Sequence, residues 1–248
     1  MNIKFIEPSV TELKRDTDWI PFLGRVAATS RRADGDDPMK AKKRVDHCFR
    51  RGHLSVFEHW PIVLRYPPTH FECRPSWHRL GGSYYGNLRM CIPDGPRDDS
   101  DFARLGSFVA QSRVGAAIEE HHTFRFVCSR YAADQLRTYR FAVAHIVESQ
   151  RYCNYAKLGF EFVCRESTET RQNAQHAVDA YTRLLEQGKA EDARAWLPMC
   201  HRTTHVITAP WWKWGEIIKQ RAHHSTGRAQ RETSELIKRV EAMLAGRE

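Results

Sequence analysis

The stretch RFAVAHIVESQRYCNYAKLGF, residues 140–160, is the most informative part of the chain because it joins an apolar run to a cluster of polar side chains. It begins with a helix-like pattern and ends in aromatic residues. The apolar run lies between Arg140 and Arg151, which predicts a partly buried segment whose arginines need anions. Guanidinium groups suit phosphates, and the adjoining Gln150 can recognise an amide edge. The stretch therefore predicts an anion-binding corner, with a solvated, salt-bridged surface segment as the alternative.

The elements predicted on either side of this stretch are mostly helical. Periodicity and capping residues predict helices at 37–52, 132–140, 173–188, 208–221 and 229–244, and alternation predicts strands at 60–66, 122–130 and 159–165. The first helix has the clearest bounds, with Asp37 as cap, Pro38 in the first turn and Gly52 past the end. Strands are few and do not alternate regularly with helices, which is typical of an α+β fold. Residues 67–101, rich in Pro and Gly, are expected to form a loop or an inserted excursion.

The composition excludes several classes of protein. A chain of 248 residues can form one large domain or two small ones, and its 39 Lys and Arg against 30 Asp and Glu give a net charge of +9. Such a balance favours anionic partners, either nucleic acid or small molecules such as nucleotides and flavins. The seven cysteines are scattered without a C-x-x-C pair, which predicts reduced thiols rather than a disulfide framework or a zinc ribbon. No apolar run approaches the roughly 20 residues of a membrane span, and the first residues lack the apolar core of a signal peptide, so we expect a cytoplasmic protein without a membrane partner.

A second polar cluster lies in GHLSVFEHW, residues 52–60, directly after the glycine that ends the first predicted helix. His53, Ser55 and Glu58 would present an imidazole, a hydroxyl and a carboxylate from the end of an element, where functional side chains are least packed. The alternative is a capping serine beside a solvated histidine and glutamate.

Further candidates lie near helix ends. Arg194, Glu216 and Arg221 could converge on one pocket, or each could have a plain structural role. His201 and His205 stand four apart and could bind a metal from a helix, but no third ligand is evident, so we expect none. Three tryptophans that could stack on a base or a flavin, or belong to the core or a subunit interface, are Trp211, Trp212 and Trp214.

Taken in order, these pieces resemble the flavin-dependent thymidylate synthase family. The matching stretches are RRGHLSVFEHW, FRFVCSRYAADQLRTYR, ESQRYCNYAK, ARAWLP, TAPWWKWGEIIKQR and AQRETSEL. They span most of the chain and leave out chiefly residues 67–120. The resemblance implies an α+β fold with helices around a small, mostly antiparallel sheet, in a single domain over residues 1–248 with an insertion at about 67–120. It also implies a homotetramer whose active sites are shared between subunits.

The resemblance also implies roles for individual residues. Those implied to bind a pyrimidine nucleotide are Gln135, Glu148, Ser149, Gln150, Arg151, Arg194 and Arg221. Those implied to lie on the flavin side are His53, Ser55, Glu58, Tyr139, Arg140 and Glu216. Arg221 matches the arginine that polarises the uracil ring, and Ser149 is implied as a hydrogen-bond partner in catalysis.

The sequence departs from the family pattern mainly on the flavin side. The family's Arg-His-Arg triplet falls on Thr138, Tyr139 and Arg140, and its following serine falls on Val143. Its flavin-contacting Asn, Arg and Asn fall on Pro210, Trp212 and Glu216. A chain that keeps the substrate arginines while changing cofactor contacts looks like a specialised paralogue, similar to the family's uridylate C5-methylases of nucleoside-antibiotic pathways.

The implied activity is reductive methylation of uracil C5 in UMP, dUMP or both. The resemblance implies FAD as cofactor, NADPH as reductant and methylenetetrahydrofolate as carbon donor, with no attacking cysteine. A cationic Arg221 facing the ring would stabilise negative charge that develops there. We expect no DNA or RNA partner. The alternatives are a housekeeping synthase that converts dUMP to dTMP and a non-catalytic paralogue that binds nucleotides or RNA, the latter motivated by the altered triplet and the net charge.

Overall fold

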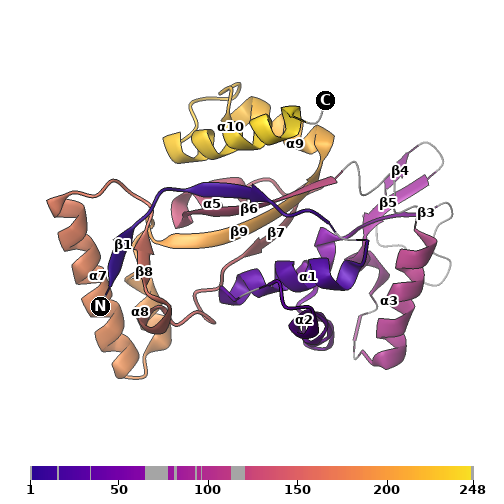
Figure 1. Cartoon of the computed structure of the whole chain (residues 1–248), viewed down its shortest axis with the longest axis horizontal. Helices are drawn as coiled ribbons and strands as arrows, with labels where there is room; N and C mark the ends of the chain where they lie inside the picture. Colours follow the sequence, from indigo (N-terminus) through magenta and orange to yellow (C-terminus); the bar gives the residue numbers. More distant parts are fainter. Residues whose placement is uncertain are drawn as a thin grey trace.

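A four-stranded antiparallel sheet forms the centre of the molecule (Figure 1). The computed structural model describes residues 2–15, 17–33, 35–64, 78–80, 83–92, 94–95, 97–112 and 121–246. The strand order is β2 (Ser9–Glu12), β6 (His121–Ser129), β9 (Arg202–Pro210) and β7 (Ala144–Val147), so β7 is an edge strand. The α+β fold class predicted from the sequence is therefore confirmed in a mixed molecule with small sheets.

Strand β9 was missed by the sequence interpretation, which began a helix at Thr208. All nine residues of β9 are buried, because the strand lies between β6 and β7 and is covered on both faces. A strand buried on both faces does not alternate between apolar and polar residues, so the usual signal is absent. The helix α9 (Trp211–Arg221) begins only where β9 ends at Pro210.

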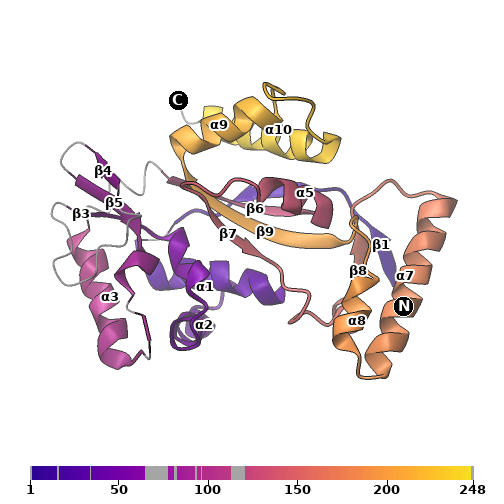
Figure 2. The ribbon, with the colours of Figure 1, turned by 180° about the vertical axis from the view of Figure 1, so that it is seen from behind.

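Helices cover both faces of the sheet, as the two opposite views show (Figures 1 and 2). On one face lie α1 (Trp19–Ala28), the 3-10 helix η1 (Thr29–Arg31), α2 (Pro38–Arg50) and the 3-10 helix η2 (Leu54–His59). The core on this side includes Val206 of β9 and Ile146 of β7. On the other face lie α5 (Arg130–Leu136), α9 and α10 (Arg231–Ala245), whose core includes Ile207 and Trp214. Adjacent residues of β9 thus point to opposite cores.

Two smaller sheets flank the centre. Strand β1 (Ile3–Phe5) pairs in parallel with β8 (Phe160–Phe162), next to α6 (Tyr155–Leu158), α7 (Thr168–Glu186) and α8 (Ala190–Ala195). On the far side, β3 (Pro61–Leu64), β5 (Ser83–Asn87) and β4 (His78–Leu80) form an antiparallel sheet, accompanied by the 3-10 helix η3 (Leu88–Cys91) and by α3 (Asp99–Gln111). None of the described helices is long and apolar enough to cross a membrane.

For residues 67–101 the loop was wrong in the part that the structure describes, and the alternative of an inserted excursion stays a prediction. This part contains β4, β5, η3 and the start of α3. The helix α3 carries a capping box between Asp98 and Asp101, a signal masked by the surrounding Pro and Gly residues. Residues 67–77, 81–82, 93 and 96 of this stretch, residues 113–120 farther along, and residues 65–66 of the expected strand 60–66 lie outside the described residues.

The bounds of α2 are confirmed and its position is fixed by close packing. Asp37 accepts hydrogen bonds from the backbone N–H groups of Met39 and Lys40 at 3.0 and 3.2 Å, and Gly52 adopts a φ of 74° just past the helix. A Cβ atom on Gly24 of α1 would lie 2.4 Å from Cβ of Ala41. The glycine therefore lets α1 and α2 approach closely, which sets the distance between the walls of the cavity described below.

Two other predictions needed correction at element ends. The helix expected at 132–140 ends at Leu136, and the start of the 140–160 stretch is a turn rather than a helix, since Ala142 has a φ of 58° before β7 begins. The helix expected at 173–188 begins earlier, at Thr168, because the side chain of Ser167 caps it.

Candidate active site

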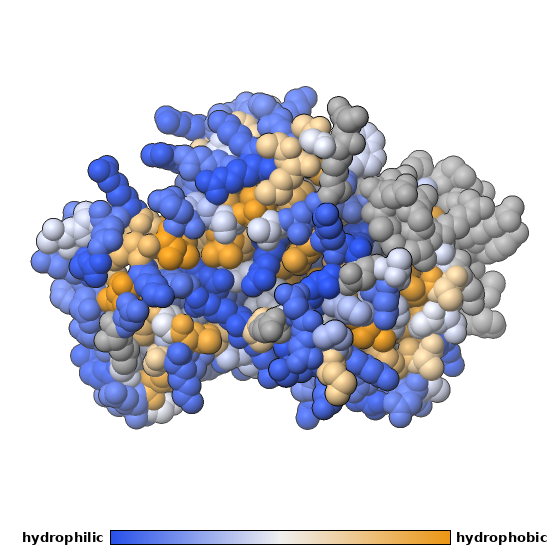
Figure 3. All heavy atoms as spheres, viewed as in Figure 1, coloured by the Kyte–Doolittle hydropathy of each residue, from blue (hydrophilic) through white to orange (hydrophobic). Residues whose placement is uncertain are grey.

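A cavity of about 1010 Å³ lies beside the edge strand β7, on the face of the sheet that carries α1 and α2. Its walls come from α1 and η1, α2, η2, the end of α5, β7 with the turn after it, and Arg194 of α8. The space-filling view shows the molecule notched between the α7–α8 part and the α1–α2 part, with many hydrophilic side chains around the notch (Figure 3).

The cavity brings together one group of the residues that the sequence singled out. The members of this group are His53, Ser55, Glu148, Ser149, Gln150, Arg151 and Arg194. They come from three stretches far apart in the chain, which meet because β7 runs alongside η2 and directs residues 148–151 toward α8. Arg151 is exposed and forms no ion pair within the described parts of the chain, so its guanidinium is available to an anion.

Backbone hydrogen bonds hold the turn after β7 in place. The N–H of Ser149 donates to the carbonyl of Ser30 at the end of η1, at 2.9 Å. The N–H groups of Tyr152 and Cys153 donate back to the carbonyl of Ser149 at 3.1 and 3.0 Å, and Ser149 Oγ accepts from the N–H of Arg151 at 3.3 Å. The turn is therefore tied to η1 and closed by its own hydrogen bonds, so the side chain of Arg151 starts from a fixed backbone position.

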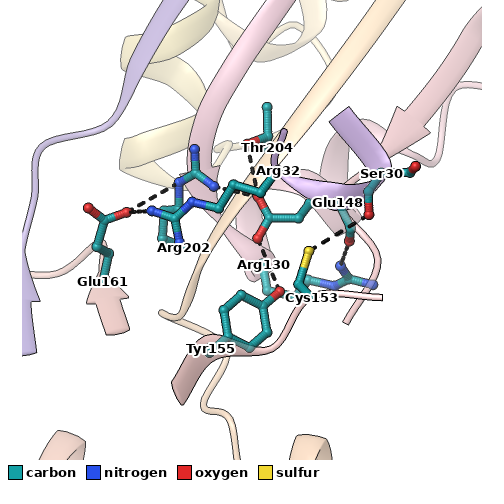
Figure 4. A network of polar contacts seen from close by, with 9 residues as sticks. All are labelled: Ser30, Arg32, Arg130, Glu148, Cys153, Tyr155, Glu161, Arg202 and Thr204. Atoms are coloured by element: carbon teal, nitrogen blue, oxygen red, sulfur yellow. Dashed lines mark hydrogen bonds and ion pairs between the residues drawn. The ribbon is translucent and has the colours of Figure 1, made fainter. Parts of the chain in front are cut away.

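Glu148 has a different role from the substrate contact that the resemblance implied. Its carboxylate is buried and pairs with Arg202, while it accepts hydrogen bonds from Thr204 Oγ1 at 3.0 Å and Tyr155 Oη at 3.1 Å (Figure 4). Burial raises the pKa of the Tyr155 hydroxyl, and the charge of Glu148 raises it further. Since protein groups occupy its oxygens, Glu148 anchors the turn that follows it rather than offering a free carboxylate to a ligand.

A second acid extends this network. Glu161 pairs with Arg32, which follows η1, and lies 3.6 Å from Nε of Arg202 (Figure 4). Burial lowers the pKa of the Arg202 guanidinium, and Glu148 opposes that effect. Arg130 Nη1 donates to the backbone carbonyl of Glu148 at 3.3 Å. The two acids and the arginines around them thus join η1, α5, β8 and β9 beneath the cavity floor.

The remaining predicted residues lie outside this cavity. Arg221 is on α9, on the other face of the sheet, where its Nε donates to Tyr139 Oη at 2.9 Å and Tyr139 Oη donates to Gln220 at 2.9 Å. Burial raises the pKa of the Tyr139 hydroxyl, and Arg221 opposes the effect. Glu216 accepts a hydrogen bond from Lys213 Nζ at 2.7 Å. A single protomer therefore keeps Arg221 apart from Arg151 and Arg194.

The other side chains that the sequence singled out also lie outside the cavity lining. Glu58 pairs with Arg89 and does not line the cavity. Arg140 is exposed in the turn before β7, and the side-chain oxygen of Gln135 is buried without a hydrogen-bond partner among the described residues. Of the tryptophans, Trp214 is fully buried in the core, whereas Trp211 and Trp212 are exposed.

A chain of histidines runs from the cavity wall into the sheet. His145 lines the cavity, with Nε2 at 2.6 Å from the carbonyl of Tyr139 and Nδ1 at 3.0 Å from Nε2 of His205. Because a carbonyl only accepts, Nε2 of His145 carries the proton and His205 Nε2–H donates to Nδ1. His201 and His205 belong to a strand and its approach, not to a helix. No group of three metal-ligating side chains is found among the residues that the structure describes.

Burial of neutral histidines predicts a strong loss of stability on acidification. Desolvation lowers the pKa of His59 and of His201 to about 3, and lowers that of His205 well below its usual value. The unfolded chain therefore binds more protons below about pH 6.5, so the stability from these neutral rings is complete above that pH and is lost as the pH falls toward 3. Each of these rings lowers the free energy of unfolding by about 1 kcal/mol between pH 6.5 and 5.5. Together the three rings lower the midpoint temperature of thermal unfolding by roughly 6–12 °C over that range.

Thermal denaturation at pH 7.5, 6.5 and 5.5 measures this effect. Replacing His201 with phenylalanine keeps an aromatic ring against Tyr155 and removes one titrating group. The decrease of the midpoint temperature per pH unit below pH 6.5 is therefore expected to become smaller by about a third. Replacing the exposed His176 with glutamine is the matched control and should leave the slope unchanged. An unfolding midpoint that stays constant from pH 7.5 to 5.5 would contradict the prediction.

The sequence interpretation missed most of the cations in the cavity lining. These are Arg31, Lys40, Lys43, Arg44, Arg130 and Arg137. The three on α2 recur at helical spacing, which could have indicated one basic face. The others follow elements whose path around the cavity is set by tertiary packing, and no local pattern marks them.

Known proteins resemble this chain in sequence and in fold. A family model described as "Thymidylate synthase complementing protein" matches residues 89–246. No curated protein sequence matches the chain. The structure of the UMP/dUMP methylase PolB from Streptomyces cacaoi bound with 5-Br dUMP is 14% identical over 98% of this chain and 92% of that chain, with a TM-score of 0.50, which indicates a shared fold.

Two further solved structures are similar at lower scores. The same methylase from Streptomyces cacaoi bound with 5-Br UMP is 15% identical over 98% of this chain and 92% of that chain, with a TM-score of 0.47. Thymidylate synthase X (ThyX) from Helicobacter pylori with FAD and dUMP is 19% identical over 62% of this chain and 80% of that chain, with a TM-score of 0.42.

Proposed function

Because the chain belongs to the thymidylate synthase complementing protein family, we propose that it methylates C5 of the uracil ring in a uridine monophosphate, UMP or dUMP. The observation that carries the proposal is the convergence of Ser149, Gln150, Arg151 and Arg194 on one cavity from two distant stretches of chain. Two guanidinium groups, a hydroxyl and an amide supply what a nucleotide phosphate and a pyrimidine edge require.

Arg151 and Arg194 hold the nucleotide phosphate in this proposal. Arg151 is exposed and unpaired in the described part of the molecule, and Arg194 has only the exposed Glu191 as partner, at 3.1 Å. An exposed ion pair is worth at most about 1 kcal/mol, so a phosphate readily replaces it. Gln150 then faces the uracil edge, and Ser149 lies close to the ring or the phosphate.

Arg221 supplies the cation that drives chemistry at C5. Uracil C5 is a poor nucleophile, and a guanidinium beside the ring stabilises the negative charge that develops as C5 attacks. Since Arg221 lies on the other face of the sheet from the cavity, we propose that a second protomer brings it to the site within a homotetramer. We further propose a single domain over residues 1–248 that carries an insertion at about 67–120.

The cofactor side of the site is proposed from the cavity and the residues around it. FAD reduced by NADPH would supply the hydride, and methylenetetrahydrofolate would supply the carbon. A volume of about 1010 Å³ exceeds what one nucleotide fills, and His53 and Ser55 on its wall offer an imidazole and a hydroxyl to a second molecule. Tyr139, Arg140 and Glu216 are proposed to contact the flavin from the neighbouring protomer. Because these residues replace the family's own, we propose a specialised role in nucleoside-antibiotic biosynthesis.

Turnover of UMP and dUMP, side by side, tests the proposed function. The protein is expected to be yellow as purified, to lose its flavin absorption band when NADPH is added, and to release a 5-methyl nucleotide when methylenetetrahydrofolate is present as well. Replacing Arg151 with alanine should raise KM for the nucleotide by about 10–100-fold, since a charged hydrogen bond contributes about 1.5–3 kcal/mol. Arg165, exposed and outside the cavity lining, provides the matched control, and its alanine variant should keep the original KM.

The same assay separates the alternatives. Exclusive use of dUMP would identify a housekeeping synthase and reject the antibiotic role. A colourless protein that takes up no flavin, converts neither nucleotide and binds long RNA with a steep salt dependence would reject the enzyme in favour of an RNA-binding paralogue.

A further inference from the structure

The cavity contains more positive charge than one nucleotide needs. Its cationic lining consists of Arg31, Lys40, Lys43, Arg44, Arg130, Arg137, Arg151 and Arg194. Glu148 is the acid among the described lining residues, and Arg202 already neutralises it. A phosphate monoester carries a charge of about −2, and Arg151 with Arg194 matches that charge. Arg130 and Arg137 pair with Asp134, which lies outside the lining, at 4.0 and 3.3 Å, and the cations that are left call for a second anionic group.

Three cations of this excess, together with a histidine on the next turn, stand on one face of α2. Lys40, Lys43, Arg44 and His47 all line the cavity and lie on successive turns of the helix. The rise of an α-helix places the first and the last of them about 10 Å apart along the axis. The opposite stripe of α2 is buried and consists of Ala41, Val45 and Phe49. The helix thus turns an apolar stripe to the core and a ladder of cations to the cavity.

Two of the α2 cations lack a partner within the described residues. Nη1 of Arg44 is buried there without a hydrogen-bond partner, and Lys43 forms no ion pair, whereas Lys40 pairs with Asp37 at 2.9 Å. Arg50, which does not line the cavity, pairs with both Asp46 and Asp99. A buried guanidinium nitrogen without a partner is costly, which indicates that an anion from outside the chain completes this wall.

The geometry points to an anion that is extended rather than compact. A monophosphate or a diphosphate presents its charge in one place, whereas the cations of α2 are spread over two helical turns. A chain of γ-linked glutamates carries one free carboxylate on each residue, which matches a ladder with about one cation per turn. The positive end of the helix dipole at the start of α2 favours the far end of such a chain.

We propose that the Lys40–His47 face of α2 binds the γ-glutamyl tail of the folate that donates carbon in the proposed function, on which this inference rests. His47 connects this face to the cofactor-side cluster, because its ring centroid lies 6.2 Å from that of His53. The folate head group then lies toward His53 and Ser55, and the tail runs along α2 toward its N-terminus. The Lys40–His47 face raises the affinity for folates with long γ-glutamyl tails and does not raise the affinity for a folate with a single glutamate.

Steady-state kinetics with two folates test this tail site. The wild-type holoenzyme should show a KM at least about ten-fold lower for pentaglutamyl than for monoglutamyl methylenetetrahydrofolate, since each added charged contact contributes about 1 kcal/mol. The double variant Lys40→Gln/Lys43→Gln should bring the ratio of the two KM values close to one. Both folates are measured on the same preparation, so partial misfolding cannot change the ratio. Lys42→Gln, exposed on α2 but outside the cavity lining, should keep the wild-type ratio.

Binding of a fluorescently labelled penta-γ-glutamate, followed by anisotropy, needs no turnover and separates the two proposals. An active enzyme with equal KM values for both folates would overturn the tail site and leave the methylase standing. An inactive protein that binds the peptide, and loses it in the double variant, would reject the methylase and support the tail site. Displacement of the peptide by a pentauridylate at lower concentrations than by unlabelled pentaglutamate would overturn the tail site in favour of single-stranded RNA.

Discussion

Replacing Arg202 with methionine is expected to lower the free energy of unfolding by about 3–5 kcal/mol, because it leaves the buried Glu148 without its cation. The carboxylate keeps its hydrogen bonds from Thr204 and Tyr155, but neither donor carries a charge. Glu161 loses its second cation at the same time and retains Arg32. The loss therefore includes an uncompensated negative charge at the base of the cavity.

A double variant identifies this charge as the cause. Glu148→Gln removes the charge and keeps an acceptor for Tyr155, so Arg202→Met/Glu148→Gln should be more stable than Arg202→Met alone by about 1–3 kcal/mol. Urea denaturation of the two single variants and the double variant gives the coupling energy. Arg183→Met on the surface of α7 is the control and should change stability by less than about 0.5 kcal/mol. Equal stabilities of Arg202→Met and the wild-type protein would show that Glu148 does not need its cation.

Local signals made much of the fold predictable. The helix α2 was placed correctly because Asp37, Pro38 and Gly52 act within a few residues of their own position. Strand β9 was missed because its polar residues find partners only in the folded protein. Arg202 pairs with Glu148, and Thr208 lies between His59 and Thr123 at 2.7 and 2.8 Å. Such partners satisfy polar groups in a core without leaving a periodic pattern in the sequence.

The candidate site was predictable only in part, for a related reason. Residue type and order were enough to single out Arg151 and Arg194, which the fold brings to one cavity. The cations of α2 and Arg31 escaped notice because their relevance depends on which face of each helix meets the cavity. Arg221 was grouped with Arg151 and Arg194 from its place near a helix end and from the resemblance, and the structure of one protomer places it on the opposite face of the sheet. The distance between Arg221 and the arginines of the cavity depends on how the layers of the fold pack, and then on how protomers pack.

Mixing two impaired variants is expected to restore activity at a nucleotide concentration near the wild-type KM if protomers share the site. Arg221→Ala should lower kcat by about 100–1,000-fold through loss of the cation beside the ring, while Arg151→Ala weakens nucleotide binding. If Arg151 comes from one protomer and Arg221 from another, random mixing leaves about a quarter of the sites with both arginines intact. Co-expression of the two variants with different tags, followed by purification through both tags, yields the mixed oligomer, whose turnover is then compared with that of each parent.

The matched control mixes Arg151→Ala with Arg194→Ala. Both arginines line the cavity of a single protomer, so every site in this mixture lacks one of them and activity should stay at the level of the parents. Recovery in the first mixture but not in the second requires that the chemistry of one cavity depends on α9 of a neighbour. Absence of recovery in both would mean that Arg221 acts within its own protomer or not at all, and the shared site would have to be abandoned. Thermal unfolding of Arg221→Ala checks that loss of its hydrogen bond to Tyr139 has not unfolded α9.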